Sequence, residues 1–410
     1  MAERAVDHLL IGGGLASANC ARWLREEGAE GSIVLVGREK DPPYNRPPLS
    51  KKYLGGQESR EDVLFRPDEW WEEQRIELLT RTSVMKLDAD ARRATLSNGD
   101  EVTFEKALLA TGANVRRLRA EGGELDGLHY LRSLANADAI AADAAQAEHV
   151  VLIGGSYIGC EVAATLTARG AKCAIVMMED VTLERVYGAE VGRFFQGVLE
   201  DHGVEIHPSD SLARFEGADG RVQRVLTESG LSLEADCVVI GAGVIPDVTL
   251  AKAAGLELGE AGGVVCSSRL ETSVSGIYAA GDICEYDSVV HGRRLRIEHW
   301  DVAFNTGKTA GLNMLGRDVA HEEIPYFFSD LADWASSEYV GPGSGDVVIR
   351  GSMDDGEFTA FYVDPGSGAV TAALTVGRSD DLEHARRFIR EKTAPEREQL
   401  ADLDSDLADL

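Results

Sequence analysis

The sequence has little of what marks secreted, membrane or nucleic-acid-binding proteins. Its 410 residues include only six cysteines, and no two of them are spaced CxxC or CxxxxC. Such isolated thiols are typical of small core residues in a reduced, cytoplasmic compartment. No uncharged apolar run approaches the ~18 residues that a membrane span needs. Glu3 and Asp7 stand where a signal peptide would carry positive charge, so no signal peptide is expected.

Basic residues are also too few to balance the acids. Lysine and arginine together number 41 against 70 aspartates and glutamates, which gives a formal net charge of −29. A polyanion of this size repels nucleic-acid backbones and anionic membranes, so neither is expected as a partner. Hydrophobic residues at 44% and charged residues at 27% indicate a soluble globular protein. The length predicts two to three domains.

One pattern occurs twice along the chain. A strand, Val6–Leu10, leads into Gly12-Gly13-Gly14 and a helix, and a second strand, His149–Ile153, leads into Gly154-Gly155-Ser156 and another helix. In each copy a further strand follows the helix, over 32–36 and 172–178, and ends near an acid, Glu39 or Glu179. The acids lie roughly 25 residues after the first glycine, near the spacing of dinucleotide-binding folds.

The chemistry explains the pattern. Glycines let a pyrophosphate approach the backbone, the helix presents bare N–H groups to the phosphates, and the acid accepts hydrogen bonds from a ribose. The alternative is two glycine-rich turns in ordinary α/β layers. Ser17 and Ser156 replace glycines of the consensus, and serine is small enough to keep the packing. Glu179 would repel a 2′-phosphate, which predicts NADH at the second site, although Arg185 is a base close by.

Further segments assign a larger cofactor to the first site. The loop over 42–51 is fixed by prolines and ends in cations, of which Arg46 and Lys51 can meet a pyrophosphate or an isoalloxazine. A strand over 106–110 ends in Ala110-Thr111-Gly112, and another over 277–280 ends in Gly281-Asp282, where an aspartate suits a polyol hydroxyl. A lone Gly-Asp is usually a turn, so the order of these segments is what makes them specific.

These motifs together resemble the FAD-dependent ferredoxin and rubredoxin reductases. That family lies in the pyridine nucleotide-disulfide oxidoreductase superfamily and includes putidaredoxin reductase, dioxygenase reductase components and apoptosis-inducing factor. The resemblance implies an α/β fold with two Rossmann-like domains and a C-terminal α+β domain. It implies a discontinuous FAD domain at 1–112 and 245–320, an NADH domain at 113–244 and a C-terminal domain at 321–394. The acidic stretch 395–410 is interpreted as a solvated tail or a short helix.

The resemblance also implies the site residues, and no metal ligand is among them. Lys51, Glu161 and Trp300 would be catalytic, with Trp300 beside the flavin near Pro47, and 326–328 would approach the other end of the ring. Core packing is the alternative for both aromatic segments. Arg38 stands where many relatives have an acid, which leaves Glu39 as the better ribose ligand. FAD contacts are implied for Gly12, Gly14, Leu15, Ala16, Glu39, Arg46, Lys51, Ala110, Thr111, Gly112, Arg132, Gly281, Asp282 and Trp300. NADH contacts are implied for Gly154, Ser156, Tyr157, Ile158, Gly159, Glu161, Glu179 and Gly243.

The expected function is a two-step electron relay. A hydride passes from NADH to FAD, and single electrons then pass to a ferredoxin or rubredoxin that feeds an oxygenase or cytochrome P450. Lys51 would stabilise the negative reduced flavin, and Glu161 would pair with Lys51 or hold the carboxamide. The chain is expected to be a monomer or a homodimer.

Two other functions remain open at this stage. A disulfide reductase or NADH oxidase needs a redox cysteine beside the flavin, and the loop over 38–51 has none, although Cys284 follows Asp282 closely. The other alternative is a redox sensor like apoptosis-inducing factor, without a dedicated acceptor.

Overall fold

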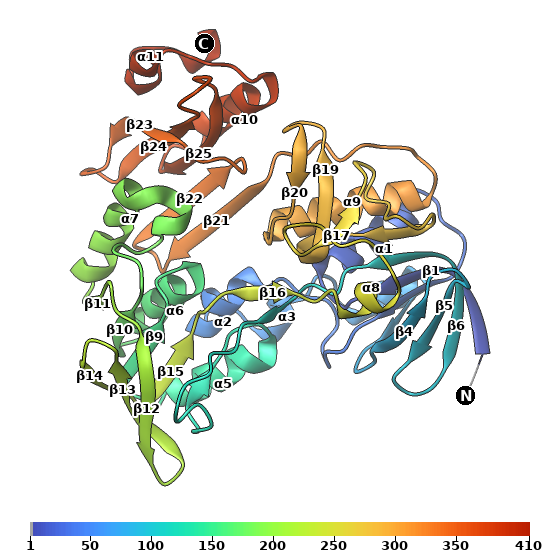
Figure 1. Ribbon diagram of the computed structural model, residues 1–410, viewed down its shortest axis with the longest axis horizontal. Helices are drawn as coiled ribbons and strands as arrows, with labels where there is room; N and C mark the ends of the chain where they lie inside the picture. The colour runs from blue at the N-terminus through green and yellow to red at the C-terminus, as the bar shows by residue number, and fades with distance from the viewer. Residues whose placement is uncertain (1–2) are drawn as a thin grey trace. The chain divides into compact units, whose positions relative to one another are not determined.

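The computed structural model describes residues 3–410, which divide into two compact units (Figure 1). The first unit contains the chain through Asn45, Glu61–Asn114 and Ile245–Tyr326. The second unit contains Arg46–Arg60, Val115–Val244 and Phe327–Leu410. Both units are therefore assembled from segments that lie far apart in the sequence.

The first unit is built on a mostly parallel sheet with the strand order β3-β2-β1-β6-β5-β4, to which β18 adds by pairing with β6. All pairings among β1, β2, β3, β6 and β18 are parallel. The sheet is extended beyond β6 by β5 and β4, whose pairings are antiparallel. The parallel strands are nearly continuous apolar runs, as expected for strands buried on both faces. The strands are β1 (Glu3–Ile11), β2 (Ile33–Val36), β3 (Ile76–Leu79), β4 (Val84–Asp88), β5 (Arg93–Leu96), β6 (Glu101–Leu109) and β18 (Ile277–Ala279).

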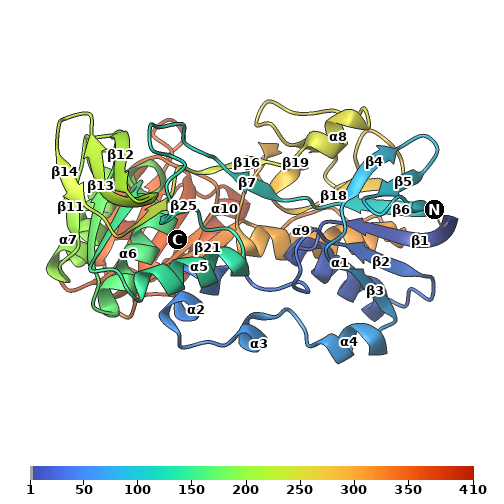
Figure 2. The same cartoon turned by 90° about the horizontal axis from the view of Figure 1, so that it is seen from below.

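Two helices of the first unit, α1 (Leu15–Glu26) and α9 (Trp300–Met314), pack against each other and against these strands (Figure 2). Their close approach depends on Gly307, where a Cβ atom would lie 2.3 Å from the carbonyl oxygen of Ala16. The helices therefore bring the first glycine-rich turn and the start of α9 to the same end of the sheet. The other elements are α3 (Arg60–Val63), α4 (Asp68–Glu73), α8 (Thr249–Ala253), η2 (Gly281–Ile283), β17 (Val264–Cys266), β19 (Cys284–Ser288) and β20 (Arg293–Leu295).

The second unit begins with a parallel sheet in the order β11-β10-β9-β15-β8. Its strands are β8 (Leu128–His129), β9 (His149–Ile153), β10 (Lys172–Val176), β11 (Glu205–His207) and β15 (Cys237–Ile240). Its helices are α5 (Leu134–Ala144), α6 (Tyr157–Ala168) and α7 (Glu184–Asp201), and the short η1 (Pro47–Ser50) and α2 (Lys52–Gly55) contact α5 and α6. An antiparallel sheet is formed by β12 (Leu212–Ala218), β13 (Arg221–Thr227) and β14 (Ser232–Glu234). The short strands β7 (Ala113–Val115) and β16 (Val244–Pro246) pair with each other, and the division of the chain into units falls within both.

The C-terminal part of the second unit is a five-stranded sheet in the order β21-β22-β25-β24-β23. Helix α10 (Asp381–Glu391) packs on β25, and α11 (Arg397–Ala401) packs on β23. A short turn over 364–369 joins the last two strands in the chain. The strands are β21 (Tyr326–Leu331), β22 (Ala335–Val340), β23 (Asp346–Ser352), β24 (Glu357–Val363) and β25 (Val370–Val376).

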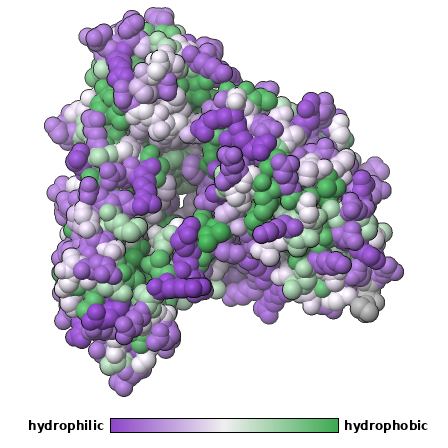
Figure 3. Space-filling view, viewed as in Figure 1, coloured by the Kyte–Doolittle hydropathy of each residue, from purple (hydrophilic) through white to green (hydrophobic). Residues whose placement is uncertain are grey.

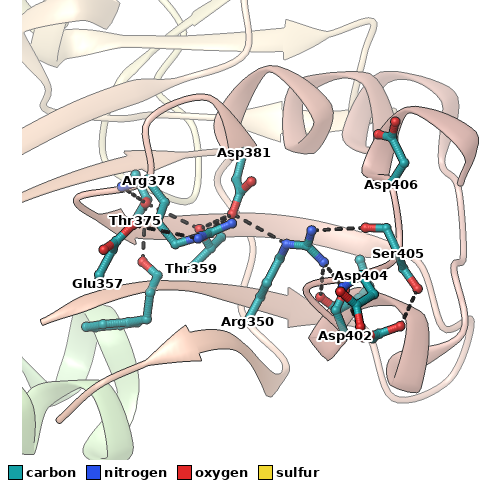
Figure 4. Close-up of polar contacts among 12 residues, drawn as sticks. Arg350, Glu357, Thr359, Thr375, Arg378, Asp381, Asp402, Asp404, Ser405 and Asp406 are labelled. Atoms are coloured by element: carbon teal, nitrogen blue, oxygen red, sulfur yellow. Dashed lines mark hydrogen bonds and ion pairs between the residues drawn. The ribbon is translucent and has the colours of Figure 1, made fainter. Parts of the chain in front are cut away.

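The acidic C-terminal stretch is packed rather than frayed. Besides α11 it contains η3 (Leu407–Asp409), and both Leu400 and Leu407 are buried. Arg350 on β23 is only 5% exposed, and its guanidinium donates to the carbonyl oxygens of Asp402 at 2.5 Å and Ser405 at 3.0 Å (Figure 4). Of the two interpretations of this stretch, the short helix is confirmed and the solvated tail is wrong, because a buried arginine and two leucines fasten it.

Charged and polar residues cover much of the face shown in Figure 3, in keeping with the net charge of −29. None of the helices in residues 3–410 has both the length and the apolar content that a bilayer crossing requires. All six cysteines are buried and free. The predicted α/β class is observed.

Candidate active site

The first glycine-rich turn joins β1 to α1 and leaves no room for side chains at its start. Gly12 has a φ of +126°, and a Cβ atom there would lie 2.0 Å from the carbonyl oxygen of Ala110. The turn is also tied to β2, because the Gly12 amide donates to the carbonyl oxygen of Val36 at 2.9 Å. The structure thus brings the predicted FAD segments at Gly12 and at Ala110-Thr111-Gly112 into direct contact.

The amino end of α1 has the features of an anion site. Gly14 is the N-cap and supplies no side-chain hydrogen bond, and the first turn carries no acidic residue. A Cβ atom at Gly14 would meet no protein atom within 4 Å, so the open side of the turn can admit a ligand. The first-turn N–H groups, with the helix dipole behind them, fit the pyrophosphate of FAD.

The Gly281-Asp282 segment lies at the same helix end. A Cβ atom at Gly281 would approach the Cβ of Ala16 to 3.3 Å, and the Gly281 amide donates to the hydroxyl of Thr306 on α9 at 3.0 Å. The 3₁₀ turn η2 is thereby fixed between α1 and α9. Two predicted FAD segments that are 265 positions apart in the chain therefore meet, since Ala16 and Gly281 are neighbours.

The acid expected to bind the FAD ribose lies just beyond β2. The Tyr44 hydroxyl donates to Glu39 Oε2 at 2.5 Å, which orients this carboxylate. Arg38, which replaces the acid of many relatives, turns to Asp247 at 3.1 Å and to Asn114 at 2.6 Å. Arg38 is therefore engaged with Asp247 and Asn114, and the ribose role of Glu39 stays a prediction.

Trp300 opens helix α9. Its indole Nε1 donates to Asn45 Oδ1 at 2.9 Å, and its ring stacks on Phe304 with centroids 5.3 Å apart. The preceding residue, His299, is the N-cap of α9, and burial lowers its pKa from 6.5 to about 4, so it is neutral at pH 7. The indole is thus held in one orientation.

The second glycine-rich turn joins β9 to α6 in the second unit. Gly154 has a φ of +110°, and a Cβ atom there would lie 2.6 Å from the carbonyl oxygen of Gly241. A Cβ atom at Gly159 would lie 1.9 Å from the carbonyl oxygen of Gly154, which closes the turn onto the helix. Ser156 is the exposed N-cap of α6 and makes no capping bond, so the helix end resembles that of α1. The turn over 154–159 and the segment 241–243 are therefore adjacent, as the NADH prediction requires.

The acid of the second site follows β10. Glu179 Oε1 forms an ion pair with Arg185 Nε at 2.5 Å, and the side chains of Glu179 and Arg185 are 21% and 71% exposed. The nearby base is thus held by the acid itself. The ribose-binding role expected for Glu179 stays a prediction.

A buried ion pair lies beside the second turn. Glu161 on α6 is 3% exposed, and its Oε2 contacts Lys51 Nζ at 2.8 Å. The Ser50 hydroxyl donates to the same oxygen at 2.5 Å, and the Ser329 hydroxyl donates to Oε1 at 2.7 Å. Every charge in the cluster is compensated, which is what allows it to stay buried. Of the two roles expected for Glu161, pairing with Lys51 is observed.

Helix α6 also holds the proline-rich loop that carries Lys51. Thr165 Oγ1 donates to the carbonyl oxygen of Ser50 at 2.8 Å, and Arg169 donates to that of Leu54 at 2.7 Å. Arg46 at the start of the loop donates to the carbonyl oxygen of Arg132. The predicted FAD contacts of Lys51, Arg46 and Arg132 stay predictions. All three residues belong to the second unit, and Lys51 and Arg46 lie on the same proline-rich loop.

Sequence reasoning missed two polar groups of this cluster. Ser50 adjoins Lys51, and nothing in the sequence distinguishes it from an ordinary loop serine. Ser329 lies on β21, where burial alternates and Phe327 and Leu331 share its buried face. A polar residue on the apolar face of a strand is a signal that could have identified it.

Two dinucleotide turns and a buried lysine–glutamate pair define a flavin- and pyridine-nucleotide-dependent oxidoreductase. Residues 6–307 match the family described as pyridine nucleotide-disulphide oxidoreductase, and residues 338–410 match a reductase C-terminal domain. The chain belongs to the pyridine nucleotide-disulphide oxidoreductase family. Its fold, its oxidoreductase class and its use of FAD and NADH, all predicted above, are confirmed by this membership.

Similar proteins have closely related names. The ferredoxin–NAD(+) reductase component of the anthranilate 1,2-dioxygenase system of Burkholderia cepacia is 34% identical over 96% of each chain. The ferredoxin reductase for the CYP199A2 system from Rhodopseudomonas palustris superposes with a TM-score of 0.93 at 32% identity, covering 98% of this chain and 99% of that one. The covalent putidaredoxin reductase–putidaredoxin complex gives a TM-score of 0.92 at 31% identity, covering 98% and 97%.

Proposed function

We propose that this chain passes electrons from NADH, through FAD, to a small iron–sulfur protein of the ferredoxin or rubredoxin type that serves an oxygenase or a cytochrome P450. The similar proteins support the acceptor, because their names place them in dioxygenase and P450 systems. The observation that carries the proposal is the buried Lys51–Glu161 pair beside a second dinucleotide turn, in a protein whose six cysteines are all buried.

In the first unit, the proposed FAD residues are the ones that converge on the amino end of α1. The turn from Gly12 to Ala16 would receive the pyrophosphate, and Glu39 would accept hydrogen bonds from the ribose. Asp282 would bind the polyol, and Trp300 would border the ring system. We further propose that Ala110-Thr111-Gly112 and Gly281 line this site, and that Arg46, Lys51 and Arg132 contact FAD.

In the second unit, the turn over 154–159 and Gly243 would receive NADH, with Glu179 on the ribose. Bound FAD supplies the redox chemistry, since it accepts a hydride and releases electrons one at a time. Lys51 would hold its ammonium where negative charge develops during hydride transfer, and Glu161 would keep that ammonium in place. The protein's part is therefore to align the two cofactors and to compensate charge.

The domain division also belongs to the proposal. We propose an FAD domain at 1–112 and 245–320, an NADH domain at 113–244, a C-terminal domain at 321–394 and a terminal segment at 395–410. A cytoplasmic location is proposed as well, because six unpaired thiols fit a reducing compartment.

Turnover with an added iron–sulfur protein tests the relay. NADH-dependent reduction of cytochrome c should rise many-fold when a [2Fe–2S] ferredoxin or a rubredoxin is present and should stay low when the same partner lacks its metal. Slow, partner-independent NADH oxidation across a panel of such proteins would instead support a redox sensor or an NADH oxidase.

A substitution tests the role of the ion pair. Lys51→Met should slow anaerobic reduction of the bound flavin by NADH about 100-fold, the usual cost of removing one electrostatic stabiliser. Lys52→Met is the matched control, because Lys52 is the adjacent, exposed lysine on α2. Equal rates for the two variants in stopped-flow measurements would remove Lys51 from the mechanism.

A further inference from the structure

Ser329 is the polar residue whose position the proposed chemistry leaves unexplained. It lies on β21 in the C-terminal sheet and is 4% exposed, yet its hydroxyl reaches Glu161 Oε1 on α6 at 2.7 Å. The two residues are 168 positions apart in the chain. A serine on a strand that otherwise buries Phe327 and Leu331 costs desolvation unless its hydroxyl has a partner.

The two oxygens of Glu161 have different partners. Oε2 receives Lys51 and Ser50, at 2.8 and 2.5 Å, whereas Oε1 receives Ser329. The last torsion of a glutamate is broad and about two-fold, so donors on one oxygen alone do not hold the plane of the carboxylate. A third donor on the opposite oxygen fixes that plane and with it the direction of the Lys51 ion pair.

The backbone of Ser329 is itself held in place by buried hydroxyl groups of neighbouring elements. The Ser337 hydroxyl on β22 donates to the Ser329 carbonyl oxygen at 3.2 Å and lies 2.9 Å from the hydroxyl of Tyr187. The Tyr362 hydroxyl on β24 donates to the Tyr187 carbonyl oxygen at 2.8 Å. Burial raises the pKa of both tyrosines far above 10, so these hydroxyls keep their protons and act as neutral donors. Two further strands of the C-terminal sheet, β22 and β24, together with helix α7, therefore support the placement of this serine.

We propose that Ser329 is a positioning residue for hydride transfer. It donates to Glu161 Oε1, holds the carboxylate so that Oε2 stays on Lys51 Nζ, and thereby keeps the ammonium at one place. This rests on the proposed role of the Lys51–Glu161 pair in the oxidoreductase. It also assigns a function to the C-terminal sheet, which completes the hydrogen bonding of a residue in the nucleotide-binding part of the same unit.

The main test uses the variant Ser329→Ala, which removes the hydroxyl group and changes the side-chain volume little. The limiting rate of flavin reduction by NADH should fall about tenfold, while the Kd for NADH from the same saturation curves should change less than twofold. Ser329→Thr restores a hydroxyl and should recover most of the rate. Ser336→Ala is the control, because Ser336 is an exposed serine on β22 whose hydroxyl bonds to Asp330 at 2.6 Å.

Two readouts separate positioning from packing. In a double-mutant cycle, Ser329→Ala should have no further effect in a Glu161→Gln background, since both changes act through one carboxylate. The midpoint potential and visible spectrum of the bound flavin should shift in Ser329→Ala and return in Ser329→Thr, with the FAD content unchanged. A merely structural serine would lower Tm without moving the potential or the spectrum.

The possible outcomes separate a failure of the Ser329 role from a failure of the proposed role of the Lys51–Glu161 pair. If Glu161→Gln and Lys51→Met both reduce flavin at the normal rate, the ion pair has no role and the proposed mechanism fails with the inference. If those variants are slow while Ser329→Ala matches Ser336→Ala in rate and potential, the inference alone is overturned. Additive effects in the double-mutant cycle would also overturn it.

Discussion

Coenzyme choice should depend on a single carboxylate at the end of β10. Glu179→Gln keeps a side chain that can hydrogen-bond a ribose hydroxyl, but it removes the negative charge that opposes a 2′-phosphate. It also releases Arg185, whose Nε now lies 2.5 Å from Glu179 Oε1. The variant should therefore accept NADPH much better than the native protein and lose only a few-fold with NADH.

The size of the change follows from charge and exposure. A carboxylate and a phosphate about 5 Å apart repel each other by about 1 kcal/mol per unit charge where water screens them well. The 71% exposure of Arg185 puts this site near that well-screened limit. With up to two charges on the phosphate, relief of about 2 kcal/mol is expected, which corresponds to about a 30-fold shift in the NADPH/NADH ratio of kcat/KM.

The assay is steady-state reduction of ferricyanide at low and high salt with each coenzyme. Asp180→Asn is the matched control, because Asp180 is the next residue, makes the same change in net charge and instead accepts a bond from Ser209. Adding Arg185→Ala to Glu179→Gln should leave the gain that comes from the lost repulsion and remove only what the released arginine adds. The reasoning is refuted if Glu179→Gln and Asp180→Asn shift the ratio equally, or if the native protein already uses both coenzymes alike.

Three further predictions concern stability and the thiols. Arg350→Ala should lower the free energy of unfolding in urea by about 3 kcal/mol, because the buried guanidinium donates charged hydrogen bonds to the carbonyl oxygens of Asp402 and Ser405. Arg397→Ala, at an exposed ion pair with Asp346, should cost under about 1 kcal/mol. Equal losses would contradict the conclusion that Arg350 holds the C-terminal stretch in place. Burial lowers the pKa of His321 from 6.5 to about 4, so the unfolded chain binds this proton first and stability falls as the pH drops from 6.5 towards 4. Between pH 7.5 and 5 this histidine should account for about 2 kcal/mol, and His321→Gln should lose correspondingly less stability over that range; an unchanged pH dependence would exclude it. Burial also raises the pKa of the Cys284 thiol well above 9, so the folded protein should resist a thiol reagent at pH 8. Cys284→Ser should keep full NADH turnover. Loss of activity in this variant would instead support the disulfide-reductase alternative.

Much of the fold could be predicted from local patterns. The two strand–glycine–helix turns lie where the sequence places them, because a backbone at φ +126° or +110° admits glycine and little else. The strand expected over 149–153 has those bounds in the structure, since buried strands need continuous or alternating apolar residues. The helix expected after Gly154-Gly155-Ser156 begins at Tyr157, directly on the glycine-rich turn.

Part of the site could be predicted and part could not. The sequence named Lys51, Glu161, Glu39 and Glu179 as functional, through motif spacing and family resemblance. It left open whether Glu161 pairs with Lys51, and the pairing at 2.8 Å answers that question. The pairing of Arg185 with Glu179 could not be predicted, because an exposed arginine has several rotamers that sequence does not rank.

The sequence alone determined the two nucleotide-binding turns, their ribose acids and the absence of closely spaced cysteines, because each depends on residues close together in the chain. Only the tertiary structure decided that Ser329 meets Glu161 and that Arg350 fastens the terminal segment. Those contacts join residues 168 and 52 positions apart, and they depend on strand register and on which elements pack together. Burial makes each of these hydrogen bonds important for stability, because a polar group removed from water must find its partner within the protein.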